Sequence, residues 1–307
     1  MNFTLRQLRI FTVVAEHKSI TKAAKELYLS QPAVSIQLKK FQQQFDLPLT
    51  ELIGKQLYIT DFGQQIVNSA HSILAEVDAI EYNSNIFKGR LAGRLRLSIV
   101  STAKYVMPYF LSGFMHLHPE VDLLMDVTNK RQVVADLEKN EADFGMVSVV
   151  PTNLDLLHVS LMPNKLYLVG EVAKDGAEHP KTLKSLTKHP LLFREAGSAT
   201  RDAMEDFLSH KRARAGKKIE LTSNEALKQA IIAGLGYSIM PLIGIKNELK
   251  NGDLEIVPLP GLPLTTEWDL VWLKSKKLSP VAAAYLEFIR REKDRIAMDK
   301  FGWTEQY

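Results

Sequence analysis

The sequence contains no cysteine, which excludes disulfide bonds, thiolate nucleophiles, thiol redox sensing and cysteine-ligated metal sites. Its 8 histidines are scattered without metal-ligand spacing, so we expect neither a metal site nor a cofactor. No apolar run approaches the roughly 20 residues that span a bilayer. The amino terminus also lacks the basic-then-apolar pattern of a secretory signal. We therefore expect a cytoplasmic protein that does not contact a membrane.

Motifs of common enzyme classes are also missing. There is no Gly-x-Ser-x-Gly nucleophile elbow and no His-Glu-x-x-His zinc motif. The glycines of Ala233-Gly234-Leu235-Gly236 end an expected helix rather than open one, so they do not form a dinucleotide-binding loop. Catalysis is therefore not the expected activity.

The charge balance separates the first 60 residues from the rest of the chain. The 307 residues are enough for two ordinary domains. The formal net charge is +4, and residues 1–60 carry eight basic against four acidic side chains, so the whole excess lies there. A module that binds a polyanion needs such an excess, but a difference this small also arises by chance.

Three short helices are expected in this basic segment. Thr4 and Gln7 have the spacing of a capping box that opens the first helix. Ser19 and Ser30 can cap the second and third helices, and Pro32 is tolerated in the first turn of the third. Two residues separate the second helix from the third, which is typical of a helix-turn-helix.

The third helix has two faces. Its apolar stripe consists of Val34, Leu38, Phe41 and Phe45. Its polar face consists of Gln31, Ser35, Lys39 and Gln42. Gln and Ser can bond base edges and Lys can meet phosphate or guanine, as in a recognition helix, and an ordinary solvated face is the alternative. A glycine turn and a β-prone run at residues 54–60 indicate a wing, with Lys55 near its tip.

Residues 19–27 (Ser-Ile-Thr-Lys-Ala-Ala-Lys-Glu-Leu) and 30–39 (Ser-Gln-Pro-Ala-Val-Ser-x-Gln-Leu-Lys) resemble the helix-turn-helix signature of LysR-type transcriptional regulators. The wing and its exit, residues 57–63, resemble theirs too. Before the wing the family usually has Leu-Phe-Glu-Arg, where this chain has Leu-Thr-Glu-Leu at residues 49–52. Thr50 and Leu52 therefore leave the DNA contacts of the wing undecided, but not the fold. The expected DNA contacts are Thr21, Lys22, Gln31, Pro32, Ser35, Lys39 and Lys55.

A single long helix is expected from Phe62 to about Phe87, without proline and with Gly63 as its only glycine. Mostly apolar residues recur in it at alternating steps of four and three: Ile66, Ala70, Ile73, Val77, Ile80, Ser84 and Phe87. A stripe this narrow pairs with a second helix or packs on its own domain. The resemblance favours pairing, because LysR-type proteins dimerise through such a linker helix. Residues 89–93 are the expected hinge.

From residue 95 onward the pattern alternates strands and helices. Strands are expected at 95–100, 121–127, 144–149, 166–169, 191–194, 218–222 and 237–241, and helices at 104–116, 131–139, 200–210 and 225–233. This predicts a doubly wound α/β fold with two lobes and a cleft, similar to periplasmic binding proteins. The expected domains are a winged helix-turn-helix (1–60), a dimerising linker helix and hinge (61–93), a two-lobed effector-binding domain (94–298) and a C-terminal tail (299–307).

Three strand-to-helix junctions are rich in hydroxyl and amide side chains: residues 101–104, 197–201 and 222–225. Each could simply cap a helix. Together, with Lys104 and Arg201 just inside two of them, they favour an anion site at converging helix N-termini. The two cations could instead be solvated, or paired with acids such as Asp202 and Glu225. The expected effector contacts are Ser101, Thr102, Lys104, Thr128, Ser148, Ser198, Thr200, Arg201 and Asn224.

Residues 101–105, 194–201 and 223–230 resemble the LysR-type subgroup that regulates carbon-fixation (Calvin-cycle) operons. The resemblance implies a sequence-specific DNA-binding regulator, not an enzyme, that is modulated by a small anionic effector bound between two lobes. The partners it implies are double-stranded DNA with an interrupted inverted repeat, further copies of the chain in a dimer or a homotetramer, and RNA polymerase. A solute-binding protein shares the two-lobed fold, but it needs an export signal and would not explain the helix-turn-helix.

Overall fold

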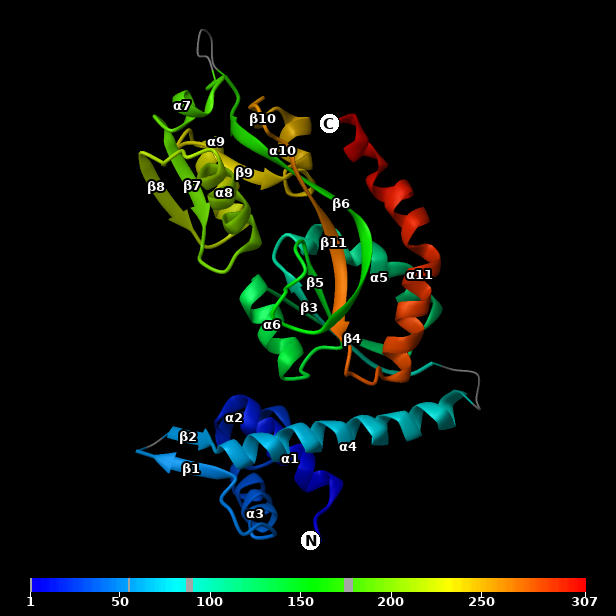
Figure 1. Cartoon of the computed structure of the whole chain (residues 1–307). Coiled ribbons are helices and arrows are strands. Elements are labelled where there is room, and N and C mark those ends of the chain that lie inside the picture. Colours follow the sequence, from blue (N-terminus) through cyan, green and yellow to red (C-terminus); the bar gives the residue numbers. More distant parts are fainter. Residues whose placement is uncertain (1, 55, 87–90, 174–178) are drawn as a thin grey trace. The chain divides into compact units, whose positions relative to one another are not determined.

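The computed structural model describes residues 2–54, 56–86, 91–173 and 179–307. The chain forms two compact units, Met1–Leu91 and Ala92–Tyr307 (Figure 1). Within these described ranges, no helix has the length and apolar character needed to cross a membrane. The same ranges contain no group of three His, Cys, Asp or Glu side chains placed to hold a metal ion.

The first unit begins with a helix-turn-helix and a two-stranded wing. The helices are α1 (Leu5–His17), α2 (Ile20–Glu26) and α3 (Gln31–Gln42), and the wing strands β1 (Thr50–Ile53) and β2 (Gln56–Ile59) are antiparallel. The predicted caps all form: the side chains of Thr4, Ser19 and Ser30 each accept a hydrogen bond from a backbone N–H of the helix that they open. The prediction of a winged helix-turn-helix is confirmed.

The apolar stripe of α3 lies in the core of this unit. Val34 and Phe41 are fully buried, together with Phe11 of α1. Phe45 lies beyond the end of α3, so the predicted helical stripe is one residue too long. Its ring still packs edge-on against that of Phe41, at a centroid distance of 5.2 Å. Since this side of α3 is enclosed, the opposite side faces outward.

The long helix α4 (Asp61–Ile86) is confirmed, and its stripe divides into two parts. Ala70 of the stripe is buried in the same core as α1 and α3, together with the neighbouring Val67, and Ile66 of the stripe packs partly buried against that core. Further along, Ile73 is 40% exposed and Ile80 is 68% exposed. Packing on its own domain therefore applies to the first half of the helix, whereas Ile73 and Ile80 in the second half are exposed. Phe87 and residues 89 and 90 of the expected hinge lie outside the described residues.

The second unit is a two-lobed α/β structure built on a seven-stranded mixed sheet with the order β10-β6-β11-β5-β3-β4, in which β9 also pairs with β6. The first lobe contains β3 (Gly93–Val100), β4 (Val121–Thr128), β5 (Phe144–Val147), α5 (Met107–Leu117) and α6 (Lys130–Glu138). The second contains α7 (Leu183–Leu186), β7 (Pro190–Arg194), α8 (Ala199–His210), β8 (Lys217–Leu221), α9 (Asn224–Ile232), β9 (Ser238–Pro241), α10 (Lys246–Asn251) and β10 (Leu254–Ile256). Strands β7 and β8 form a separate parallel pair.

Two long strands connect the lobes. Strands β6 (Leu156–Glu171) and β11 (Leu264–Leu273) are antiparallel to each other, and a register shift interrupts them at Trp268/Asp269. Near one end β11 pairs with β5 of the first lobe, and near the other end β6 pairs with β9 and β10 of the second (Figure 1). The sequence predicted only residues 166–169 of β6 and none of β11.

The predicted helix over residues 104–116 is wrong in its first turn. A 3₁₀ turn (Ala103–Tyr105) precedes α5, which begins at Met107 with Pro108 in its first turn. Proline has no backbone N–H and is tolerated only where a helix begins. A new helix therefore starts at this point.

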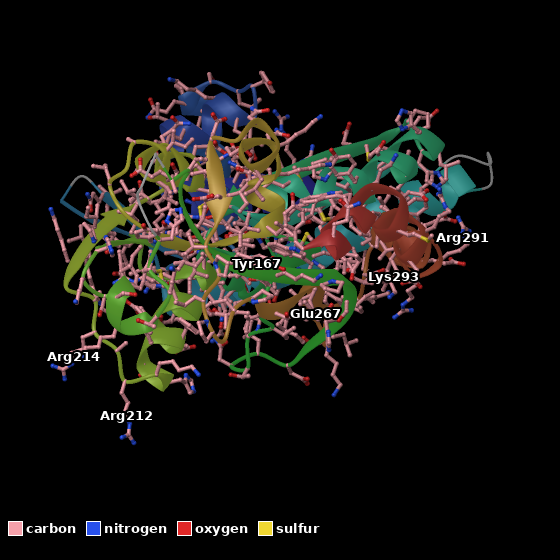
Figure 2. All side chains as sticks on the ribbon, turned by 90° about the horizontal axis from the view of Figure 1, so that it is seen from above. Tyr167, Arg212, Arg214, Glu267, Arg291 and Lys293 are labelled. Carbon is pink, nitrogen blue, oxygen red and sulfur yellow. The ribbon has the colours of Figure 1, made fainter. Side chains whose placement is uncertain are left out.

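The C-terminal helix α11 (Pro280–Phe301) and the 3₁₀ turn η3 (Gly302–Gln306) contact both lobes. The ring of Phe301 stacks on Phe110 of α5, at a centroid distance of 6.0 Å. Trp303 packs against the core of the second lobe, beneath the ammonium group of Lys246. On the outer side of α11, Arg291 projects away from the ribbon (Figure 2). Residues 299–307, expected to form a tail, therefore continue the ordered helical structure.

Gly63, in the first turn of α4, lies directly against the backbone before the wing. A Cβ at this position would lie 2.1 Å from the carbonyl oxygen of Leu49. We predict that Gly63→Ala lowers the free energy of unfolding of the first unit by about 1–3 kcal/mol, the usual cost of overpacking. Urea denaturation, with hydrogen exchange in α1–α4 to localise the effect, measures this.

The matched control is Gly302→Ala, because a Cβ at Gly302 meets no atom within 4 Å. Equal stability of both variants would show that Leu49 can move aside at no cost.

Candidate functional site

The outward face of α3 carries the polar residues expected to read DNA. Gln31, Pro32, Ser35 and Lys39 are all exposed. Gln42 differs from them, because its Oε1 accepts a hydrogen bond of 2.8 Å from Oγ1 of Thr50 on the wing. Gln42 therefore holds the wing against the helix instead of standing free.

Exposed residues on α2 and the wing extend this face. Thr21 and Lys22 are exposed on α2, whereas Lys55 lies outside the described residues. On β1, Leu52 is 70% exposed. It lines a hollow between α3 and the wing together with Lys39. The wing thus presents an apolar side chain at the position where the family pattern has arginine.

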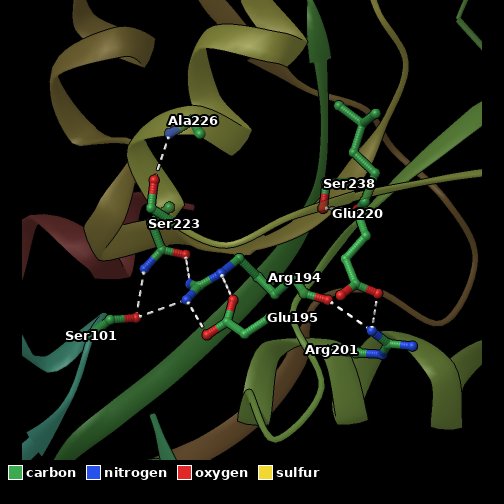
Figure 3. A network of polar contacts seen from close by, with 10 residues as sticks. Ser101, Arg194, Glu195, Arg201, Glu220, Ser223, Ala226 and Ser238 are labelled. Carbon is green, nitrogen blue, oxygen red and sulfur yellow. Dashed lines mark hydrogen bonds and ion pairs between the residues drawn. The ribbon is translucent and has the colours of Figure 1, made fainter. Parts of the chain in front are cut away.

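A cluster around Arg194 joins the two lobes of the second unit (Figure 3). Arg194 ends the buried strand β7, and its side chain is only 2% exposed. Its Nε and Nη2 donate to the two carboxylate oxygens of Glu195, at 2.8 and 2.9 Å. Nη1 donates to Oδ1 of Asn224 on α9, and Nη2 also donates to Oγ of Ser101, at 3.2 Å. Because Ser101 follows β3 of the first lobe, this guanidinium joins the two lobes.

Ser101 is the contribution of the first lobe to this cluster. Its Oγ accepts a second hydrogen bond, of 3.3 Å, from Nδ2 of Asn224. A hydroxyl has two acceptor positions and one donor hydrogen. Both acceptor positions are occupied by donors of the second lobe, and no described residue accepts the Ser101 hydrogen, which can therefore bond a further acceptor.

Two other hydroxyls behave differently from ordinary helix caps. Thr102 and Ser198 are each 6% exposed, and neither side chain caps the helix that follows it. Ser223, in contrast, accepts a hydrogen bond of 3.0 Å from the backbone N–H of Ala226. The capping interpretation therefore holds for the third junction, whereas the first two leave their hydroxyls without that bond.

The remaining expected hydroxyls lie at matching strand ends. Thr128 pairs with Val100 at the end of the β3–β4 ladder, and Ser148 directly follows β5, which runs parallel to β3. Both residues are thus at the same edge of the sheet as Ser101. Thr200 is buried in the first turn of α8.

The two cations that the sequence favoured are both paired with acids. Arg201 donates to Glu220 at 2.6 Å and to Glu205 at 3.1 Å, and the hydrogen bond to Glu220 holds the pKa of Arg201 above its ordinary value. Nζ of Lys104 lies 3.6 Å from Oε1 of Glu225. The alternative of acid pairing thus applies to both, with Glu205 and Glu220 in place of Asp202 for Arg201.

A second set of contacts between the lobes lies beside the Arg194 cluster. The hydroxyl of Tyr105 donates to Glu225, and Lys228 lies 3.0 Å from Glu225 and 2.6 Å from Glu248. Burial alone would raise the pKa of Glu225, but the hydrogen bonds from Tyr105 and Lys228 hold it below its ordinary value. Glu225 is thus a charged acceptor shared by both lobes.

Sequence reasoning missed two arginines of the cleft. Arg194 ends the apolar run Leu191-Leu192-Phe193, and a cation inside a buried strand was the signal that could have identified it. Arg131 of α6 in the first lobe lies beside the loop before α8: a Cβ on Gly197 would be 3.5 Å from its Nε. No residue in the described part of the chain forms an ion pair or a side-chain hydrogen bond with Arg131.

Two family models match these two units. "Bacterial regulatory helix-turn-helix protein, lysR family" matches residues 5–64, and "LysR substrate binding domain" matches residues 88–294. A winged helix-turn-helix followed by a two-lobed effector-binding domain defines a transcription regulator that responds to a small molecule. The chain belongs to the LysR family of these DNA-binding regulators, and it is not an enzyme.

Similar proteins match over nearly their whole length. The "HTH-type transcriptional activator CmpR" of Synechocystis sp. is 35% identical over 289 residues, which cover 94% of this chain and 95% of the relative. The "RuBisCO operon transcriptional regulator" of Allochromatium vinosum is 36% identical over 297 residues, 96% of this chain and 98% of the relative. These names confirm the resemblance to carbon-fixation regulators.

A solved structure shows a related effector domain with a ligand. The regulatory domain of CcmR from Synechocystis PCC6803, in complex with 2-PG, is 29% identical and covers 64% of this chain and 95% of its own. The TM-score is 0.60. A relative of this chain thus binds a small molecule in the corresponding domain.

For the DNA-binding face, we predict that Gln31→Ala mainly changes the sequence preference of DNA binding and that Lys22→Ala mainly changes its affinity. We expect Gln31 on α3 to read a base, a contact worth about 1–3 kcal/mol of discrimination. We expect Lys22 on α2 to meet phosphate, so its loss should weaken binding to all sequences alike and reduce the salt slope by about one. Fluorescence anisotropy with selected and scrambled duplexes at several salt concentrations measures both effects.

The control is Lys250→Ala, which removes an exposed lysine from α10 of the other unit. Unchanged preference and affinity in Gln31→Ala would contradict a base-reading role for this residue.

Proposed function

We propose that this regulator senses a small organic anion with phosphate or carboxylate groups, bound between the lobes, and that it controls a carbon-fixation operon. The observation that carries the proposal is the buried Arg194, which is bonded to residues of both lobes. An anion held at this point contacts both lobes at once. Such a ligand stabilises the closed cleft and thereby changes how the regulator is arranged on DNA.

The other polar groups of the cleft support an anion rather than a neutral ligand. The hydroxyl of Ser101 has a hydrogen to donate, and Thr102 and Ser198 are not engaged as caps. Arg131 adds a positive charge without a partner among the described residues. A set dominated by donors and cations suits a ligand rich in acceptor oxygens. The related CcmR domain, which is in complex with 2-PG, supports a small-molecule ligand in this domain.

The proposed effector contacts keep most of the residues named from the sequence and add two arginines. They are Ser101, Thr102, Thr128, Arg131, Ser148, Arg194, Ser198, Thr200 and Asn224. Lys104 and Arg201 contribute less in this proposal, because Glu225, Glu205 and Glu220 already balance their charge.

We further propose that the chain dimerises through α4, binds an interrupted inverted repeat and assembles as a dimer of dimers. A two-fold protein meets a two-fold site, which is why the repeat is inverted. The support is the exposed second half of the α4 stripe. RNA polymerase is the proposed partner in activation, and the cytoplasm, where bacterial DNA lies, is the proposed location.

For the effector, we predict that calorimetry detects binding of 2-PG or of another phosphorylated or dicarboxylic metabolite. Arg131→Ala and Thr102→Ala should each weaken this binding by about 1–3 kcal/mol, the usual cost of losing a charged or buried hydrogen bond. The matched control is Arg214→Ala, since this exposed arginine projects outward from the second lobe (Figure 2). Binding of neutral or purely apolar compounds alone would reject an anionic effector while leaving the family assignment intact.

For the assembly, we predict that the double variant Ile73→Asp, Val77→Asp loses both dimers and DNA affinity. Two carboxylates in an apolar seam without partners are strongly unfavourable. Light scattering gives the mass, and anisotropy with an inverted-repeat duplex gives the affinity. A wild-type protein that is monomeric at micromolar concentration would contradict pairing through α4.

A further inference from the structure

The carboxylate of Glu195 binds Arg194 as a free anion would. Its two oxygens accept from Nε and Nη2 at 2.8 and 2.9 Å. This bidentate geometry is the one by which arginine binds carboxylate and phosphate ligands. The anion position on the buried guanidinium is therefore already filled by the protein itself.

The two partners differ in how firmly they are held. The side chain of Arg194 is 2% exposed, whereas that of Glu195 is 20% exposed. Within the described residues, the side chain of Glu195 bonds only to Arg194. Glu195 is the first residue of the loop before α8, and Gly197 in this loop has a φ of +88°. Glu195 can therefore swing away without disturbing the core.

Arg194 has other bonds that keep it in place when Glu195 leaves. Its Nη1 is bonded to Asn224 and its Nη2 to Ser101. Its carbonyl oxygen accepts a hydrogen bond of 3.2 Å from Arg201. The edge that faces Glu195 would then be presented to a ligand with its geometry already formed.

We propose that Glu195 is an internal competitor that occupies the anion position on Arg194 until the effector displaces it. This inference rests on the proposed function and states how the same site is regulated. It also names the ligand class. A single carboxylate gains from Arg194 no more than Glu195 already provides, so displacement requires a ligand with more negative charge, such as a phosphate dianion or a dicarboxylate.

A purely structural role for this pair makes a different prediction. In that case Glu195 is the permanent counter-ion of a buried arginine, and its removal leaves an uncompensated charge. Removing the Glu195 carboxylate would then lower the free energy of unfolding, but the affinity for the ligand would be unchanged or weaker. Affinity therefore distinguishes the two roles.

The decisive variant is Glu195→Gln, which keeps the shape of the side chain and removes its charge. We expect it to bind 2-PG and inorganic phosphate about tenfold more tightly than wild type or better, because the ligand no longer displaces a charged hydrogen-bond partner. Arg194→Ala should bind neither. Calorimetry on the full chain measures these affinities.

The matched control is Glu292→Gln on α11. Glu292 also accepts from Nε and Nη2 of an arginine, Arg295, and its side chain is likewise 20% exposed. The variant removes the ion pairs of a glutamate with two exposed arginines, Arg291 and Arg295, far along the sequence from the cluster. It should leave the affinity for both ligands unchanged.

Glu195→Ala gives an independent test that does not depend on the affinity of the effector. Acetate from solution should take the vacant position on Arg194 and raise the melting temperature of this variant, but not that of wild type. This measurement also replaces the first one if Glu195→Gln does not fold.

The outcomes separate the inference from the proposed function. Tighter anion binding by Glu195→Gln supports the competitor role, also if wild type binds too weakly to detect. Equal or weaker binding by Glu195→Gln overturns that role while wild-type binding upholds the anion sensor. If neither wild type nor Glu195→Gln binds any anion of the panel, the proposed function fails as well.

Discussion

The contact between the two lobes depends on the hydrogen bonds and the ion pair that compensate one buried guanidinium, that of Arg194. Removing such a charge from water costs several kcal/mol of free energy, which the ion pair and the hydrogen bonds around it must offset. Glu195 and Asn224 supply acceptors from the second lobe, and Ser101 supplies one from the first. The need to satisfy this group therefore brings residues of both lobes to one point. A change in the groups that are bonded to Arg194 therefore also changes the contact between the lobes.

Local signals were sufficient for much of the fold. Side-chain caps such as that of Thr4 and the period of the apolar stripe in α3 depend on residues within a few positions, so the helix-turn-helix and α4 could be predicted. The full length of β6 and all of β11 could not. These two strands stabilise each other across about a hundred residues of sequence, through pairs such as Leu166 with Leu264.

The same distinction applies to the candidate site. The three hydroxyl-rich junctions were visible in the sequence, and the structure joins Ser101 to Asn224 across the cleft. The sequence did not show which basic side chains are left without an acidic partner, because this depends on neighbours in the tertiary structure. Arg201 meets Glu220 through the pairing of β7 with β8, whereas Arg131, outside every expected motif, keeps its charge free of acidic partners among the described residues.

The division of α4 has a mechanical consequence. Val67 and Ala70 lie in the same core as Val34 and Phe41 of the recognition helix, so α3 and the first half of α4 form a single rigid body. A rotation of the exposed second half about the helix axis turns the DNA-reading face by the same angle. The first half of α4 is thus continuous with the core that holds α3, and a change in the direction of α4 also changes the direction of the outward face of α3.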